Sequence, residues 1–598
     1  MKGKVSNVVK KQEILFMHDI HSHIDSFKTI VNKEEVSAGG FARIKTLINE
    51  KKKKNPNALV IDGGDFSMGT LMQTAFVKEC LELRMLGDLE CDVTTIGNHE
   101  FDYGSKGLSE ALNTAIKSGD NLPKLVLGNI DWKGMTKRGL TIGQQLLKNA
   151  FEKYGLKDYI TVNKGDIKIV IFGLFGKHAY RCSNACELKF RDSLKAARDI
   201  VDKIKAKENP DMIICLSHSG TFDNLKMSED ENLAKNIPEI DIIVSAHTHT
   251  TLTKPICYGD TYIVSCGCYG INFGNISMEQ KENGRWKINE YELIPITEEI
   301  KENDIIKSKI KAVYDHIDQE YLLHFGYRRN QVLAKNRVNF STVNDLLFSN
   351  DDQNLGNLLS DAFRYAVEKC DKNDTNPVDI VVVPAGCVRD TFSKGYITVE
   401  NVFNSYSLGM GYDKKPVFPL ASSYLTGKEL KLIMEIDASA TNMGEVARLY
   451  TAGLKYTYNV NKLLLNRVTQ FHIMKKDGKL EPLEDKKLYR VVADLGAARM
   501  LKGIREMSFG LINLKPKDNF GRAIKDLESA IIYNNDKELK AWVAIAMYIQ
   551  SFPDTDGDGI ADIPYEYSVA DGRRSICESR PFREILLRYF YKPKRNLG

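Results

Sequence analysis

The sequence lacks a long hydrophobic run, an excess of one charge and any internal repeat. Its longest apolar candidate, 167–176, is broken by Lys168 and Gly173, so no segment reaches the length of a membrane span. The 84 basic and 79 acidic side chains leave a net charge of only +5, which disfavours nucleic-acid binding driven by overall charge. We therefore expect a soluble protein with no membrane span and no stable nucleic-acid partner. The sequence does not indicate an oligomeric state.

Cysteine is present but lacks the pattern of a disulfide framework. The eleven cysteines, an odd number, are scattered from Cys80 to Cys577. Cys182 and Cys186 have no second pair at zinc-finger spacing, so we interpret the cysteines as reduced thiols. The apolar run 14–17 is too short for a signal peptide. These features predict a cytoplasmic protein.

The length of 598 residues exceeds what one compact core needs, so at least two domains are expected. In the first 300 residues, short β-branched runs alternate with helical segments, which is typical of an α/β domain. The composition then turns to Lys, Glu, Asp and Ile at helical spacing. We predict domains over 1–296 and 331–598, a helical linker over 297–330, and a mostly helical last hundred residues.

Five predicted strands of the first domain lead directly into polar side chains that can bind metals. The runs and the side chains that follow them are 14–17 with Asp19 and His21, 58–61 with Asp65, 93–96 with Asn98 and His99, 212–216 with His218, and 242–244 with His247 and His249. Open α/β sheets build their ligand sites beyond the carboxyl ends of the strands. Mixed nitrogen and oxygen ligands favour Zn, Mn, Co or Fe over Ca or Mg, so we predict a metal site.

Taken in this order, the five motifs resemble the signature of the calcineurin-like metallophosphatases. More narrowly, the chain is similar to the 5'-nucleotidase family, a group of nucleotide catabolism that includes UDP-sugar hydrolases and 2',3'-cyclic phosphodiesterases. The resemblance implies an N-terminal two-sheet sandwich flanked by helices and a C-terminal α/β substrate domain. It also implies a binuclear centre with Asp19, His21 and His249 at one metal, Asn98, His218 and His247 at the other, and Asp65 bridging both.

The chemistry of paired cations supports this arrangement. Two neighbouring cations need a bridging carboxylate, and water held between them loses a proton near neutral pH, which gives a hydroxide that can attack phosphorus. His99 follows Asn98 and can approach the leaving group, while Asp102 can orient it. By resemblance the two match the catalytic pair of the family. The alternative for Asp102 is a turn residue.

The second domain has a weaker resemblance to the substrate domain of the 5'-nucleotidase family. Arg389 ends the segment 384–389, which resembles a turn whose arginine contacts substrate; a capping or surface role is the alternative. Asn98 is the other predicted substrate contact. Leu408 stands where the family has a stacking phenylalanine, and 496–500 replaces its Gly-Gly-Asp-Gly loop, so base preference is open.

An acidic segment near the end of the chain matches the first part of a calcium loop. Its oxygen side chains are those of Asp554, Asp556, Asp558 and Asp562. Tyr565 stands where the twelfth-position acid belongs, and a glycine-rich acidic turn is the alternative.

We therefore predict an enzyme, a two-metal hydrolase of nucleotide phosphate esters. Alternatives with related chemistry are a 2',3'-cyclic phosphodiesterase, a sugar-nucleotide hydrolase and the sulfur-oxidising branch that splits a sulfate group with manganese. An alternative of another class is a catalytically silent metal-binding scaffold, although the intact Asp65, Asn98, His99 and His218 argue against it.

Overall fold

The computed structural model describes residues 9–31, 34–183, 185–443, 448–463, 465–507 and 514–577. Its contacts divide the chain into two compact units, Met1–Glu320 and Tyr321–Gly598. The division falls inside the segment 297–330 that the sequence predicts as a helical linker. The limits of the predicted domains stay a prediction.

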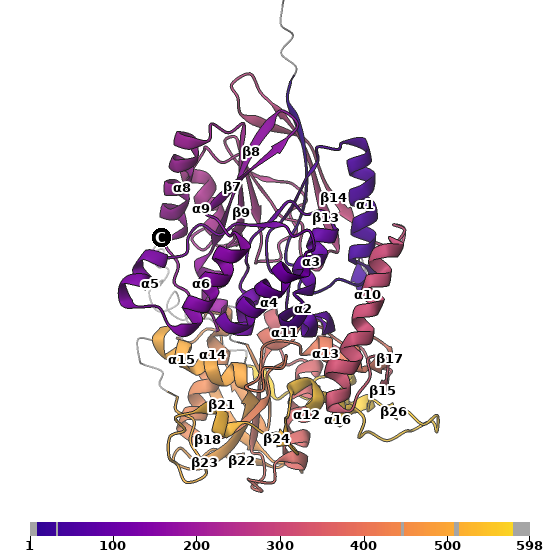
Figure 1. Ribbon diagram of the computed structural model, residues 1–598. Helices are drawn as coiled ribbons and strands as arrows, with labels where there is room; N and C mark the ends of the chain where they lie inside the picture. Colours follow the sequence, from indigo (N-terminus) through magenta and orange to yellow (C-terminus); the bar gives the residue numbers. More distant parts are fainter. Residues whose placement is uncertain are drawn as a thin grey trace, which may run out of the picture. The chain divides into compact units, whose positions relative to one another are not determined.

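Two six-stranded sheets form the first unit, with the orders β14-β13-β1-β4-β5-β6 and β11-β12-β10-β9-β8-β7 (Figure 1). The strands are β1 (Lys11–Met17), β4 (Leu59–Asp62), β5 (Val93–Thr94), β6 (Lys124–Leu125), β7 (Tyr159–Lys164), β8 (Ile167–Phe175), β9 (Met212–His218), β10 (Ile242–Ser245), β11 (Ile256–Tyr258), β12 (Thr261–Val264), β13 (Asn272–Gln280) and β14 (Trp286–Pro295), with β2 (Phe27–Val31) and β3 (Glu34–Ala38) as a separate hairpin. In each sheet the central strands run parallel, so their carboxyl ends lie at one edge.

The core of the first unit lies between the two sheets. Along β8, Ile169 and Ile171 join strands of both sheets in one buried cluster, whereas Val170 and Phe172 pack into a second cluster on the other face. Successive side chains of a strand point to opposite faces, so a strand that is apolar throughout is buried on both sides. The predicted two-sheet α/β sandwich is confirmed.

Helices cover the outer faces of the sandwich. Ile200 of α8 and Leu233 of α9 belong to the second cluster, together with Val170 and Phe172 of β8. The helices of this unit are α1 (Phe41–Lys54), α2 (Phe76–Glu79), α3 (Leu81–Asp88), α4 (Gly104–Ser118), α5 (Trp132–Arg138), α6 (Ile142–Tyr154), α7 (Lys177–Cys182), α8 (Ser193–Lys207), α9 (Glu229–Asn236) and α10 (Asp304–Ile317).

The second unit also combines helices and sheets. Its sheets have the orders β18-β23-β16-β19, β22-β21-β20-β27, β17-β15-β26 and β24-β25. The strands are β15 (Val332–Asn336), β16 (Ile380–Pro384), β17 (Gly395–Thr398), β18 (Leu420–Thr426), β19 (Leu449–Ala452), β20 (Leu454–Tyr458), β21 (Val468–Met474), β22 (Leu480–Pro482), β23 (Leu488–Asp494), β24 (Tyr533–Asn534), β25 (Lys537–Glu538), β26 (Ala561–Asp562) and β27 (Arg574–Ile576). The helices are α11 (Val343–Phe348), α12 (Asn354–Cys370), α13 (Val399–Ser405), α14 (Gly427–Met443), α15 (Leu495–Met507) and α16 (Ala541–Ile549).

The end of the chain differs from the predicted helical extension. Within the described residues 514–577, α16 is the one α-helix, and the remainder forms short strands and 3₁₀ turns. β26 pairs with β15 and β27 pairs with β20, so these segments are strands because distant partners bind their backbones. Residues 578–598 lie outside the described part of the chain.

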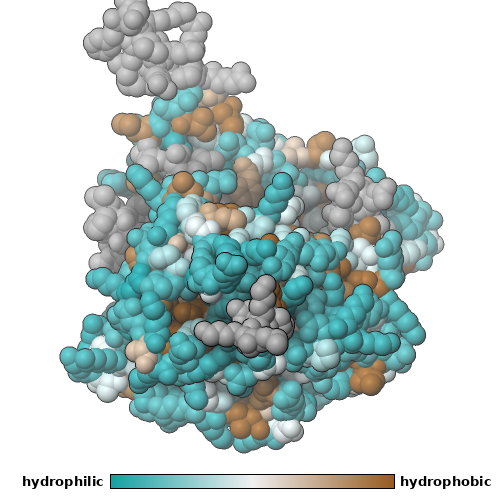
Figure 2. All heavy atoms as spheres, turned by 90° about the horizontal axis from the view of Figure 1, so that it is seen from above, coloured by the Kyte–Doolittle hydropathy of each residue, from teal (hydrophilic) through white to brown (hydrophobic). Residues whose placement is uncertain are grey.

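The face shown in Figure 2 is mostly hydrophilic, and its hydrophobic residues lie in separate small groups. Across the described residues, no helix has both the length and the apolar character that crossing a membrane requires.

Candidate metal centre

The predicted metal-binding side chains come together at the carboxyl ends of the strands. Segments after β1, β4, β5 and β10 supply them, together with the last residue of β9. All seven predicted ligands are buried or half-buried: Asp19, His21, Asp65, Asn98, His218, His247 and His249.

One group of ligand atoms is formed by Asp19, His21 and His249. His21 Nε2 lies 2.9 Å from His249 Nε2, and Asp19 Oδ1 lies 3.8 Å from the first nitrogen and 3.6 Å from the second. His21 Nδ1 donates to the carbonyl oxygen of Met68, which leaves Nε2 for a cation.

A second group surrounds His218. Its Nε2 lies 3.1 Å from Asp65 Oδ2 and 3.3 Å from Asn98 Oδ1, while its Nδ1 donates to the carbonyl oxygen of Gly63. The ligand atoms of Asp65, His218 and His247 lie within 4.8 Å of one another. Asp65 Oδ2 is also 3.8 Å from His21 Nε2, so this carboxylate adjoins both groups.

The protonation states of Asp65 and His247 suit a pair of divalent cations. At His218 burial disfavours the charged ring, but the charge of Asp65 outweighs burial and raises the pKa to about 10, so a cation bound there would displace a proton. Burial disfavours a charged Asp65, but the imidazoles of His218 and His99 outweigh burial and hold the pKa of this carboxyl well below its usual range. Burial and the neighbouring His218 lower the pKa of His247 well below its usual range, so its ring is neutral. A metal ligand must be a carboxylate or a neutral imidazole. The donor set therefore fits divalent metals.

The backbone takes an uncommon conformation at most of these ligands. A positive φ is found at Asp19 (52°), His21 (50°), Asp65 (52°), His247 (76°) and His249 (54°). Left-handed backbone at residues other than glycine is uncommon and concentrates at functional sites.

The carboxylate of Asp65 lies against the backbone of the segment after β5. A Cβ atom at Gly97 would lie 2.1 Å from Asp65 Oδ1, so only glycine fits there. The backbone N–H of His99 donates to the same Oδ1 at 2.8 Å. The bridging candidate is thus held by backbone on the side away from His218.

The predicted catalytic pair is formed. His99 Nδ1 lies 2.7 Å from Asp102 Oδ2, and each side chain is 15% exposed. The His99 and His21 rings meet edge to face at 4.9 Å, so this pair lies beside the first ligand group.

Three supporting residues had no predicted role. His18 Nδ1 lies 2.6 Å from Asp19 Oδ2, and its Nε2 accepts from the backbone N–H of Cys266. Glu100 accepts from the backbone N–H groups of Asp65, Ser67 and Gly97, and burial and the charge of Asp65 raise its pKa to about 8.

The third supporting residue, Asp230, joins the ends of two strands. Its carboxylate accepts from the hydroxyl group of Ser217, which directly precedes His218. It also accepts from the hydroxyl group of Ser245, which lies two residues before His247. His18 and Glu100 stand inside the motifs and could have been suspected from them. Nothing in the sequence near Asp230 distinguishes it from a surface helix residue.

In the second unit, Arg389 is half-buried just after the 3₁₀ turn Ala385–Cys387, and its backbone N–H donates to the carbonyl oxygen of Ser405. Leu408, the residue at the expected stacking position, is buried at 8% exposure. Segment 496–500 lies in α15, whose start is capped by Asp494 Oδ1 accepting from Ala497. The substrate role of Arg389 stays a prediction.

The acidic segment is only partly arranged as a calcium loop. Ligand atoms of Asp554, Asp556 and Asp558 lie within 4.8 Å of one another, and all three residues are exposed. Lys335 pairs with Asp556 and Asp558, and Asp562 Oδ2 instead accepts from Thr555. The acidic turn therefore already has its counter-charge from a lysine.

Two known families match the chain. Residues 13–251 match the family described as calcineurin-like phosphoesterase, and residues 338–501 match the 5'-nucleotidase C-terminal domain.

Curated relatives match over most of the chain. It is 26% identical over 498 residues to the trifunctional nucleotide phosphoesterase protein YfkN of Bacillus subtilis, covering 80% of this chain but 31% of that protein. It is 27% identical to a 5'-nucleotidase-related protein of Glossina morsitans morsitans and 25% identical to the 5'-nucleotidase of Mus musculus. Those matches cover 80% of this chain and 85% and 81% of the relatives.

Solved structures share the fold. A 5'-nucleotidase precursor from Thermus thermophilus matches with a TM-score of 0.73 at 20% identity, over 96% of this chain and all of that one. The sulfate thiohydrolase SoxB from Thermus thermophilus matches with a TM-score of 0.63 at 17% identity, over 95% and 97%.

Proposed function

We propose that this chain, a metal-dependent phosphoric ester hydrolase that joins a calcineurin-like phosphoesterase domain to a 5'-nucleotidase C-terminal domain, hydrolyses phosphate esters of nucleotides. The convergence of the seven predicted ligand side chains, with Asp65 adjoining both groups, carries the proposal. The family and the enzyme class agree with the prediction from the sequence.

The residues of the first unit would divide between two cations. Asp19, His21 and His249 would hold one cation, and Asn98, His218 and His247 the other. Asp65 would be shared by both. When bound, divalent cations supply a nucleophile from water and offset the charge of the phosphate. The family implies divalent metals, and Mn, Zn, Co or Fe is our proposal for their identity.

His99 would serve the leaving group. Its Nδ1 is held by Asp102, and we assign its Nε2 to the leaving oxygen. The Asp102 carboxylate keeps the ring in one orientation and stabilises its charged form, from which a proton can pass to that oxygen.

The names of the relatives support a nucleotide as the substrate, and we propose Asn98 and Arg389 as residues that contact the substrate. A guanidinium suits phosphate because it donates two parallel hydrogen bonds. A 2',3'-cyclic nucleotide or a sugar nucleotide is the second candidate. Leu408 offers no ring for stacking on a base, so no base preference is proposed. We also propose a cytoplasmic location, from the cysteine pattern.

A substrate screen tests this proposal. The full chain would be supplied in turn with Mn²⁺, Co²⁺ and Zn²⁺ and mixed with 5'-mononucleotides, 2',3'-cyclic nucleotides, UDP-sugars and a thiosulfonate ester. Released phosphate, nucleotide and sulfate would be measured, with the Asp65→Ala variant as the blank. Release from a nucleotide by the wild type alone is expected. If no nucleotide is hydrolysed, the alternative of a catalytically silent metal-binding scaffold is favoured. Release of sulfate alone would favour the sulfur-oxidising branch.

A further inference from the structure

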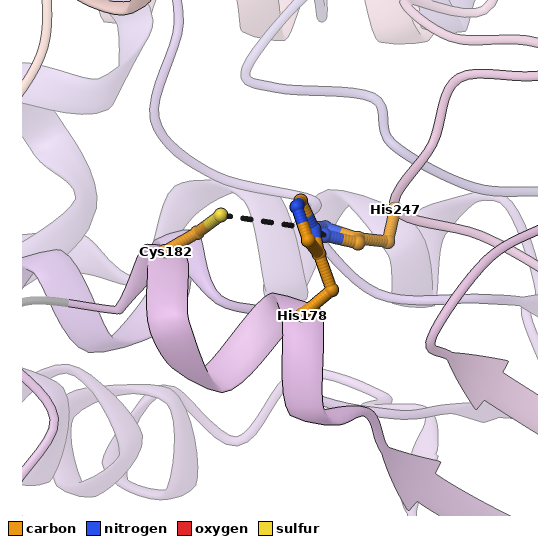
Figure 3. A group of neighbouring side chains, drawn as sticks. All are labelled: His178, Cys182 and His247. Carbon is orange, nitrogen blue, oxygen red and sulfur yellow. Dashed lines mark hydrogen bonds between the residues drawn. The ribbon is translucent and has the colours of Figure 1, made fainter. Parts of the chain in front are cut away.

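A cluster of metal-binding side chains lies beside the predicted metal pair. It includes His178, which no earlier argument used, and Cys182, which the sequence analysis interpreted as a reduced thiol. His178 and Cys182 are four residues apart on α7, so they lie on one face of that helix. Both point toward His247, which comes from the segment after β10 (Figure 3). All three residues are half-buried, so a small ion can reach them from solvent.

The three ligand atoms of this cluster are close together. His178 Nδ1 lies 2.7 Å from His247 Nε2 and 3.9 Å from Cys182 Sγ. The nitrogen separation is close to the 2.9 Å between His21 and His249, the two imidazoles predicted to share one cation. Around zinc, nitrogen ligands lie about 2.0–2.1 Å and sulfur about 2.3 Å from the ion, so two nitrogens of a tetrahedral site lie about 3.3–3.4 Å apart, and the two rings would separate by about 0.6 Å to admit a cation.

Hydrogen bonds and a ring contact hold α7 in place beside the cluster. The carboxylate of Glu229 in α9 accepts from the backbone N–H groups of Lys177 and His178 and so anchors the first turn of α7. The ring of Phe222 meets the His178 ring edge to face at 5.1 Å. Ligands held by packing and by hydrogen bonds around them bind a metal with little loss of conformational freedom.

We propose that His178, Cys182 and His247 bind a third divalent cation of the zinc type. One thiolate and two imidazoles are soft and intermediate ligands, which favour zinc over magnesium or calcium. Binding forms bonds from the cation to Cys182 Sγ, His178 Nδ1 and His247 Nε2. It breaks the hydrogen bond between His178 Nδ1 and His247 Nε2 and releases the thiol proton of Cys182 and the proton on His247 Nε2 to solvent, which leaves His247 as an imidazolate when its other nitrogen binds the predicted pair. His247 then connects this cation to the predicted pair through its other ring nitrogen.

The site does not depend on the proposed substrate, and it has a spectroscopic signature of its own. No cysteine belongs to the predicted pair, so a thiolate bond to metal reports the third cation. Cobalt(II) bound by a thiolate gives a near-ultraviolet charge-transfer band that nitrogen and oxygen ligands do not give.

The experiment titrates the metal-free full chain with Co²⁺ and counts bound zinc by elemental analysis. The wild type should show the band and bind three zinc ions per chain. Cys182→Ser and His178→Ala should each lose the band and bind two. Cys186→Ser, a nearby thiol outside the cluster, should behave as the wild type, and circular dichroism should show that all variants are folded.

Several outcomes would overturn the proposal. One is a wild type without the band, which would reduce the contact between His178 and His247 to a hydrogen bond. Another is a band that persists in both Cys182→Ser and His178→Ala. The Asp65→Ala variant separates this proposal from the proposed function, because it should lose turnover yet keep the band.

Discussion

The two units of this chain place their predicted functional residues in different ways. In the first unit the predicted ligands follow the ends of parallel strands, and the structure brings all seven together. In the second unit Arg389 and Leu408 lie in or beside turns, and the residues expected around them in the family are replaced. The carboxyl ends of parallel strands bring the residues that follow them to one edge of the sheet. A residue in a turn depends instead on the conformation of that turn.

The most severe test of this contrast removes the residue that both ligand groups share. Asp65→Ala should abolish binding of the predicted metal pair and reduce kcat by more than about four orders of magnitude, because enzymatic rate enhancements begin near six orders. Metal content and phosphate release would be measured together. Asp120→Ala, at an exposed aspartate paired with Arg84, is the matched control. A variant that keeps both metals would break the first half of the comparison.

The next test separates holding metal from assisting the leaving group. His99→Ala should keep the metals and lower kcat by roughly two to four orders of magnitude, since general acid catalysis contributes about that much. Asp102→Asn should cost less, and His316→Ala, at an exposed histidine of α10, should cost nothing. Loss of metal from the His99 variant would contradict the role assigned to this residue.

In the second unit, Arg389→Ala should raise KM about ten- to a hundredfold with metal content unchanged. The reason is that a hydrogen bond to a charged group contributes about 1.5–3 kcal/mol to the free energy of binding. Steady-state kinetics on the best nucleotide would measure this change, with Arg522→Ala at the exposed pair with Asp518 as the control. An unchanged KM would mean that the turn does not position a substrate residue here and would sharpen the contrast between the units.

The smallest expected effect concerns the support of the strand ends. Burial raises the pKa of Asp230 to about 7, so the folded protein binds its proton up to a higher pH than the unfolded chain does. The stability contributed by this protonation is complete below the unfolded pKa near 4 and is lost as pH rises through 7.

The free energy of unfolding of the wild type should therefore decline by up to about 1.4 kcal/mol per pH unit between about pH 4 and pH 7, and Asp230→Asn should remove this decline. Denaturant unfolding of metal-free wild type and variant at several pH values would measure the difference in slope. Parallel slopes for the two proteins would show that Asp230 does not titrate in this window.

Much of the first unit was predictable because each motif pairs a strand signal with metal-binding chemistry. The local sequence supplied the ligand-bearing motifs and the neighbouring His99 and Asp102. The two-sheet sandwich and the division of the ligands into two groups were predicted from the resemblance to a known family. Asp230 was not predictable, because its importance depends on two serines that reach it only through the fold. The last hundred residues were predicted to be mostly helical, but within the described residues 514–577 only α16 is an α-helix, because β26 and β27 pair with distant strands whose positions no local pattern indicates.

The left-handed ligands have a consequence for folding stability. Each of the five residues Asp19, His21, Asp65, His247 and His249 holds a conformation that costs about 1 kcal/mol or more outside glycine. Together the cost is on the order of 5 kcal/mol, which is comparable with the net stability of many domains. Asp and His adopt this conformation more readily than most residues, so the cost lies at the low end. Cations that bind these side chains would then act as folding cofactors, stabilising a backbone that the polypeptide alone would tend to relax.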